Sequence, residues 1–98
     1  MDDNPSFLIV LTPSAIQQFS NLDASLRDEV RQHAAIVGED PSGELVRQPA
    51  RDYGEGVYAY EFVSDVVHGL TIRLVFSSVD FHARIARMIA IVQLYKSD

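Results

Sequence analysis

The 98-residue sequence contains no cysteine. Disulfides, thiolate catalysis and thiolate metal sites are therefore excluded, and the absence is compatible with a reducing compartment. No apolar stretch reaches the ~20 residues that a membrane-spanning helix needs. The first residues, Met1 to Pro5, lack the positive charge of a secretory signal. We expect a cytoplasmic protein with no membrane contact.

The sequence also lacks an excess of basic residues. It has 8 Lys and Arg against 14 Asp and Glu, a formal net charge of −6. Residues 1–44 account for the imbalance, with two basic and eight acidic side chains. Proteins that grip nucleic acid are usually basic, because neutralising phosphates supplies most of the non-specific affinity. A nucleic-acid site here would need local clustering of the later arginines, which are Arg47, Arg51, Arg73, Arg84 and Arg87.

Familiar catalytic motifs are missing as well. There is no Walker or dinucleotide glycine motif, no HExxH, no histidine pair with ligand spacing and no nucleophile elbow. We therefore expect no cofactor and no metal ion. His82 lies on a predicted loop beside Asp80, the arrangement that a general base oriented by a carboxylate needs. His33 falls on an apolar helix stripe and is expected at the edge of the core.

The sequence does contain enough apolar residues for one hydrophobic core. Its hydrophobic content is 47% and its charged content 22%, values typical of a globular protein, and the length suits one domain over residues 1–98. Residues 7–11 form an apolar, β-branched run of strand length. Thr12 and Pro13 then supply a cap and a first helical residue, so a strand is followed by a helix.

Two helices are predicted behind this strand. The first is short and is interrupted at Asn21, and the second begins after Asp23 and ends at the cap residue Gly38. The second helix has an apolar stripe that faces the core. The stripe consists of Leu26, Val30, His33, Ala34 and Val37, and the opposite face of Arg27, Asp28, Glu29, Arg31 and Gln32.

The second half of the chain predicts three strands. Residues 39–56 form a long connection, with a short strand at 45–46, and strands follow at 57–63, 70–77 and 85–94. The last strand is apolar on nearly all positions and should be central. Short connections favour antiparallel pairing. The predicted fold is α+β, in the order β-α-α-β-β-β, with the N-terminal strand and helical hairpin packed on a mainly antiparallel sheet.

Tyr58, Tyr60 and Phe62 alternate along the strand at 57–63. Such an aromatic face either packs beneath the helices or stacks on the bases of single-stranded RNA. Core packing is the interpretation that we favour, since an alternating aromatic face commonly fills the core of a small sheet.

A single arginine, Arg73, stands in the middle of the apolar strand at 70–77. Arginine is rarely buried without a partner, so it either points into a site or lies on the open face of the sheet. There its rigid guanidinium would clamp a phosphate. Alternatively, Glu61 on the neighbouring strand pairs with it across the sheet.

The order of elements, the helix opening at residues 11–15 (Leu-Thr-Pro-Ser-Ala) and the run at 72–76 (Ile-Arg-Leu-Val-Phe) together resemble the RelE/ParE superfamily of bacterial toxins. The resemblance covers nearly the whole chain. It implies a toxin-family component of a type II toxin–antitoxin module, active in plasmid stabilisation and bound by a cognate antitoxin. RelE-like members are mRNA interferases, ribosome-dependent endoribonucleases that inhibit translation, whereas ParE-like members inhibit DNA gyrase. Further partners would thus be the ribosome with mRNA, or DNA gyrase.

The resemblance also assigns a functional face. The arginine of the penultimate strand in RelE-like members corresponds to Arg73. Where cleaving members carry basic residues on the preceding strand, this chain has Ala59 and Glu61. That departure supports an alternative, a catalytically degenerate toxin fold that acts as a non-enzymatic protein–protein binding module, and enzymatic activity stays undecided. The candidate catalytic residues are Arg73, Arg87, Tyr95 and Lys96.

Overall fold

The computed structural model describes residues 8–39, 48–49, 56–80 and 82–96. Within these ranges the predicted order of strand, two helices and three strands is confirmed, and a two-residue strand is added after the helices. The elements are β1 (Leu8–Leu11), α1 (Pro13–Ser20), α2 (Ala24–Glu39), β2 (Gln48–Pro49), β3 (Tyr58–Val63), β4 (Leu70–Asp80) and β5 (Ile85–Tyr95).

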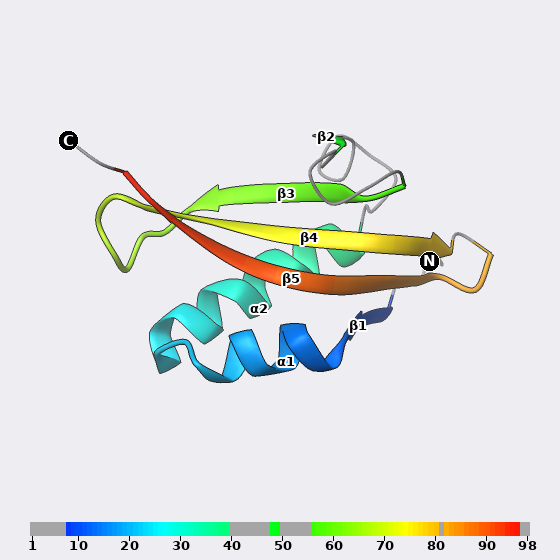
Figure 1. The fold of residues 1–98 in the computed structure, drawn as a ribbon, viewed down its shortest axis with the longest axis horizontal. Coiled ribbons are helices and arrows are strands. Elements are labelled where there is room, and N and C mark those ends of the chain that lie inside the picture. The colour runs from blue at the N-terminus through cyan, green and yellow to red at the C-terminus, as the bar shows by residue number, and fades with distance from the viewer. Residues whose placement is uncertain (1–7, 40–47, 50–55, 81, 97–98) are drawn as a thin grey trace, which may run out of the picture.

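The strands form one sheet in the order β1-β5-β4-β3-β2. β1 runs parallel to β5, and the other neighbours are antiparallel, so the sheet is mainly antiparallel as predicted. β5 lies in the interior of the sheet, between β1 and β4. Both helices cover the same face of the sheet (Figure 1). The short strand predicted at residues 45–46 lies outside the described residues.

Local sequence signals account for the helix boundaries. The Thr12 side chain caps α1, since its Oγ1 accepts a hydrogen bond from the Ala15 N–H at 3.3 Å, and Pro13 occupies the first turn. The prediction that Gly38 ends α2 was wrong. The helix continues through Gly38, which is buried, and ends at Glu39.

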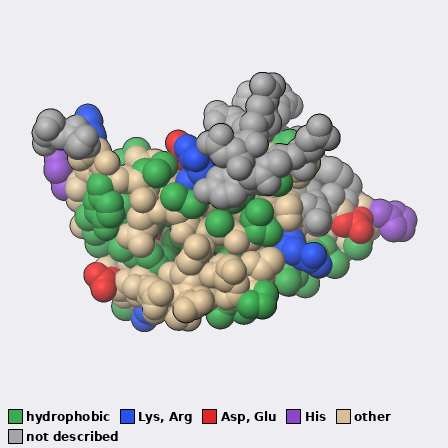
Figure 2. All heavy atoms as spheres, viewed as in Figure 1, with side chains coloured by type: hydrophobic (Ala, Val, Ile, Leu, Met, Phe, Trp, Pro, Cys, Tyr) green, Lys and Arg blue, Asp and Glu red, His purple; other side chains and the backbone are tan. Residues whose placement is uncertain are grey.

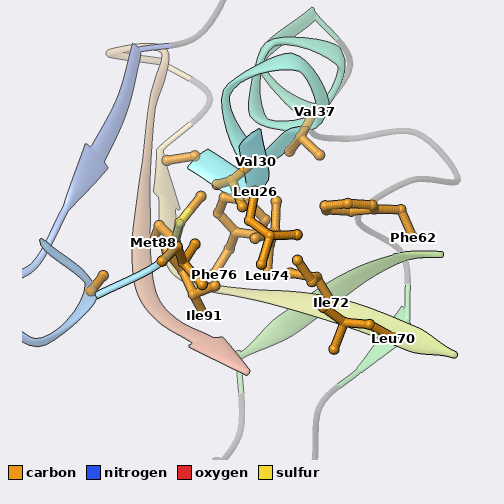
Figure 3. Packing of buried hydrophobic residues seen from close by; sticks show 13 residues of the cluster. Leu26, Val30, Val37, Phe62, Leu70, Ile72, Leu74, Phe76, Met88 and Ile91 are labelled. Atoms are coloured by element: carbon orange, nitrogen blue, oxygen red, sulfur yellow. The ribbon is translucent and has the colours of Figure 1, made fainter. Parts of the chain in front are cut away.

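The core lies between the helices and the helix-facing side of β4. Leu70, Ile72, Leu74 and Phe76 alternate along this strand and are fully buried. Figure 3 shows them packed beneath residues from α2, and the predicted stripe is confirmed because Leu26, Val30 and Val37 are buried while His33 and Ala34 are partly buried. Burying each large aliphatic side chain contributes roughly 1.5–3 kcal/mol.

The aromatic face of β3 also belongs to this core. Phe62 is buried, and Tyr58 and Tyr60 pack partly buried against the same cluster, so core packing is confirmed. His33 of α2 stacks on the Phe62 ring at a centroid distance of 3.8 Å. Its Nδ1 atom lies 2.8 Å from the Tyr60 hydroxyl, which places His33 at the core edge as predicted.

Glu29 departs from the predicted pattern. The sequence places it on the solvent face of α2, but only 8% of its surface is exposed. Its Oε1 accepts a hydrogen bond from the Ser64 hydroxyl at 2.5 Å, and its Oε2 accepts one from the Asp65 N–H at 2.6 Å. The Ser64 hydroxyl oxygen in turn accepts the N–H groups of Val66 and Val67, both at 3.0 Å. The hydrogen bonds of Glu29 therefore connect α2 to the β3–β4 turn.

We predict that Glu29→Ala lowers the free energy of unfolding by about 2–4 kcal/mol, because it leaves the buried Ser64 hydroxyl and the partly buried Asp65 N–H without their acceptor. Urea denaturation would measure the loss. Asp28→Ala is the matched control. Asp28 directly precedes Glu29 and pairs at the surface with Arg31 at 3.1 Å, so the loss of stability should stay below about 1 kcal/mol. Equal losses for the two variants would contradict the assignment.

Candidate functional site

Arg73 lies on the face of the sheet that the helices do not cover. The register places it between Glu61 of β3 and Val92 of β5. Successive strand residues point to opposite faces, and its neighbours Ile72 and Leu74 point into the core. We call the opposite side, which carries Glu61, Arg73, Val75 and Val92, the outer face.

On the outer face Arg73 is paired with Glu61. The Nε atom of Arg73 donates to Glu61 Oε2 at 2.6 Å, and Nη2 lies 2.6 Å from the same oxygen. The two side chains are 29% and 41% exposed, so water still reaches the pair. The cross-strand pairing considered from the sequence is confirmed. The Arg73 guanidinium is therefore bonded to a carboxylate of its own chain. That carboxylate occupies the position that a phosphate bound to Arg73 would need.

Beside this pair the outer face is apolar. Val57, Ala59 and Val75 are buried, and residues of β5 pack against them. The ladder pairs Val75 with Ala90 but Phe76 with Met88, so β5 has a bulge that places one extra residue at this point. The β5 residues in the cluster are Ile89, Ala90 and Val92. Ala59 thus belongs to an aliphatic cluster.

The other candidate residues are exposed and lie apart from Arg73. Arg87 pairs in the ladder with Ser77, so it lies on the outer face but roughly 13 Å along the strand from Arg73, at about 3.3 Å per residue. Tyr95 pairs with Leu70, a core residue, so it lies on the side of the sheet opposite Arg73. The structure does not bring them into one cluster.

Two hydrogen bonds lie at the C-terminal end of β5. The Tyr95 hydroxyl donates to Gln93 Oε1 at 3.1 Å, and the Lys96 N–H donates to the Gly69 carbonyl at 2.8 Å. Lys96 is thus held at the β3–β4 turn. On the side seen in Figure 2, Lys and Arg side chains are scattered and form no single patch. The catalytic role that the resemblance assigns to Arg73, Arg87, Tyr95 and Lys96 stays a prediction.

The β4–β5 turn does not orient His82 through Asp80. Asp80 Oδ1 accepts the main-chain N–H groups of His82 at 3.0 Å and Ala83 at 2.9 Å, so this carboxylate closes the turn. Arg84 ends the turn in the left-handed backbone region, with φ of 58°. The general-base arrangement considered from the sequence is therefore not formed.

Among the described residues, no group of three or more histidine or acidic side chains could hold a metal ion. Nor is any helix of the described ranges long and apolar enough to cross a membrane. Arg47 and Arg51, which were considered as neighbours of Arg73, lie outside the described residues.

Comparison with known proteins identifies the fold. No family model and no curated protein sequence matches the chain. Among solved structures, the intact RelBE toxin–antitoxin complex of Escherichia coli matches with a TM-score of 0.67 and 16% identity, over 95% of this chain and 99% of that chain. A RelBE complex from Mycobacterium tuberculosis gives 0.73 and 12%, over 92% and 100%.

The chain has the RelE toxin fold. The isolated RelE toxin of E. coli agrees, with a TM-score of 0.68 and 16% identity over 95% of this chain and 89% of that chain. The resemblance drawn from residues 11–15 and 72–76 is confirmed at the level of the fold. At such low identity the likeness does not extend to the residues of the site.

Within this RelE-like fold, the sequence interpretation did not find the hydrogen bond between Tyr60 and His33. Both residues lie on core-facing stripes, and that shared placement is the only signal that points to their contact. Burial raises the pKa of the Tyr60 hydroxyl above the usual 10.0. The folded chain therefore holds this proton at a pH where the unfolded chain has lost it. The resulting stability is present below about pH 10 and is lost as the pH rises through the folded pKa.

We predict that an ultraviolet absorbance titration of the tyrosines resolves one late ionisation step, above the usual tyrosine pKa, that belongs to Tyr60. Tyr60→Phe should remove that late step and should reduce the loss of stability above about pH 10. Tyr95→Phe, the control at an exposed position, should leave the late step in place. A titration in which Tyr60→Phe removes only an ordinary step would contradict the assignment.

Proposed function

We propose that this protein is the toxin component of a bacterial type II toxin–antitoxin module and that it works in the cytoplasm with a cognate antitoxin. The observation that carries the proposal is the extent of the structural match: RelE toxins align with 92–95% of this chain, and two of the matched structures are toxin–antitoxin complexes. The proposed action is growth inhibition, with translation as the target in the manner of RelE-like members or DNA gyrase in the manner of ParE-like members.

Ribosome-dependent mRNA cleavage would make Arg73 the principal charged residue of the site. Its guanidinium would stabilise the charge that develops on the phosphate during cleavage, provided that Glu61 moves aside. Inhibition of gyrase would instead need a protein-binding surface and no free guanidinium. The two actions therefore predict different consequences for Arg73→Ala.

We predict that induced expression of the wild-type chain arrests bacterial growth. If translation is the target, methionine incorporation falls before thymidine incorporation, and Arg73→Ala slows mRNA cleavage by about 10²–10³-fold, as loss of one charge-stabilising donor typically does. If gyrase is the target, thymidine incorporation falls first and Arg73→Ala still arrests growth.

Arg31→Ala is the matched control, since Arg31 is an exposed arginine paired with an acidic residue but lies on α2. It should arrest growth as the wild type does. Soluble wild-type protein that leaves growth unchanged in cells without an antitoxin would contradict the proposal.

A second candidate function is favoured by the ion pair itself. Glu61 neutralises Arg73, and the surface next to the pair is aliphatic where cleaving members carry basic residues. A phosphate approaching Arg73 would meet the negative charge of Glu61. These features support a catalytically degenerate toxin fold that binds another protein and cleaves no RNA.

This second candidate predicts that the wild-type chain has negligible affinity for single-stranded RNA and that Glu61→Gln raises it. Freeing one arginine for one phosphate should steepen the dependence of log affinity on log salt concentration by about 0.7. Fluorescence anisotropy with a labelled RNA would measure both. Glu39→Gln removes an equal charge from α2 and should leave the salt dependence unchanged. Strong RNA binding by the wild type would exclude the binding-module function.

A further inference from the structure

The β3–β4 turn, residues 64–69, lies at the same end of the sheet as the C-terminal end of β5 (Figure 1). Few apolar contacts hold this turn in place. Val67 packs partly buried against the core cluster, but Val66 is 49% exposed, and Asp65 and His68 are exposed as well. Segments that bury little apolar surface are those that open locally while the rest of a protein stays folded. Polar contacts therefore supply much of the attachment of this turn.

These polar contacts converge on the Glu29 carboxylate of α2. Its Oε1 accepts the Ser64 hydroxyl, and its Oε2 accepts the Asp65 N–H. The Ser64 oxygen has no further acceptor capacity, because its two lone pairs already accept the N–H groups of Val66 and Val67. The Asp65 N–H can only donate. Both groups that face the carboxylate are therefore donors to it.

This arrangement accommodates only the ionised form of Glu29. A protonated carboxyl, like a carboxamide, has one good acceptor oxygen and carries a donor at the other position. That donor would face either the Asp65 N–H or the Ser64 hydroxyl, and neither has a free lone pair to accept it. One of the two groups would then lose its acceptor, and the bonds that remain would no longer be charge-assisted. Neutralising Glu29 therefore weakens the attachment of the turn to α2.

The turn is also bonded to the end of β5. The Gly69 carbonyl accepts the Lys96 N–H at 2.8 Å. The next residue, Leu70, is fully buried in the core, so the sheet that stays closed begins there. A movement of the turn away from α2 that displaces Gly69 would therefore break the bond to Lys96 as well.

Other ionisable groups lie on the elements around Glu29. His33 lies one turn further along α2 and is bonded to Tyr60 of β3. Glu61 and Arg73 are on the outer face, on the other side of the sheet, and α1 has no charged side chain. The ionisable side chains of the turn and of the end of β5, all exposed, are Asp65, His68, Tyr95 and Lys96. A positive charge on His33 would attract ionised Glu29 and so would favour the closed turn.

We propose that ionised Glu29 holds the β3–β4 turn closed, and that neutralising it opens residues 65–69 and the end of β5 together as one local unit. The core stays folded during this opening. The inference goes beyond the proposed function and does not depend on it. It describes an acid-sensitive conformational device built into the contact between α2 and the turn.

Glu29→Gln is the direct test, because the carboxamide closely matches the carboxylate in shape and has no charge. Native-state hydrogen exchange followed by NMR would give the protection of single amides. At neutral pH the variant should lose about ten- to a hundredfold of the wild-type protection at Asp65 and at Lys96 in parallel, since one buried donor has lost its acceptor. The central-strand amides of Ile72 and Leu74 should stay at least about tenfold better protected than the turn, which distinguishes local opening from unfolding.

Asp28→Asn is the matched control. It removes an equal charge from the exposed residue that directly precedes Glu29, and it should keep the wild-type protection of the turn.

The wild type provides a second test that needs no substitution. Lowering the pH should reduce the protection factors of the turn amides and of Lys96 in parallel, while the core amides stay protected. Glu29→Gln is already neutral at this position and should show no such response to acid. Should Glu29→Gln fail to fold, the wild-type titration decides alone, because unchanged protection of the turn in acid would contradict the proposal.

Three results would overturn the proposal. The first is wild-type protection of the turn in folded Glu29→Gln. The second is loss of protection at the turn without loss at Lys96, which would show that the two do not open together. The third is an acid response that Glu29→Gln retains, which would assign the response to another ionisable group such as His33.

Discussion

Burial of one side of β4 is the constraint on which the rest of the structure depends. Leu70, Ile72, Leu74 and Phe76 are fully buried on the side facing the helices, and β3 and β5 pair with this strand along most of its length. A register shift of one residue would move all four into solvent, so the register is strongly specified. The same register determines the outer face. It places Arg73 directly opposite Glu61, so the ion pair follows from packing on the other side of the sheet.

Much of the fold was predictable because its signals are local. The cap at Thr12, the apolar stripe of α2 and the alternation in β3 and β4 each depend on residues a few positions apart. The burial of Glu29 was not predictable in that way. A carboxylate is buried only where hydrogen-bond donors pair with it. The donors to Glu29 belong to a turn about 35 residues later in the chain. Placed on a helical wheel, Glu29 adjoins the apolar stripe, which is the only hint that the sequence offers.

The candidate site was predictable only in part. Pairing between Arg73 and Glu61 was among the alternatives because adjacent strands bring such residues together. The separation of Arg87 and the placement of Tyr95 on the opposite side depend on the ladder between β4 and β5, including its bulge, and periodicity within one strand does not reveal a register. On the outer face, Arg73 thus lies beside a glutamate and aliphatic residues. The proposed cleavage of RNA would require Glu61 to move away from Arg73.

The most direct test of this account is a double-mutant cycle on Arg73 and Glu61. Urea denaturation of the wild type, Arg73→Ala, Glu61→Ala and the double variant would give the coupling free energy between the two side chains. For a half-exposed cross-strand pair we predict about 0.5–1 kcal/mol at low salt, declining as salt is added. A coupling of zero at low salt would show that Glu61 does not hold Arg73 in solution and would contradict the account.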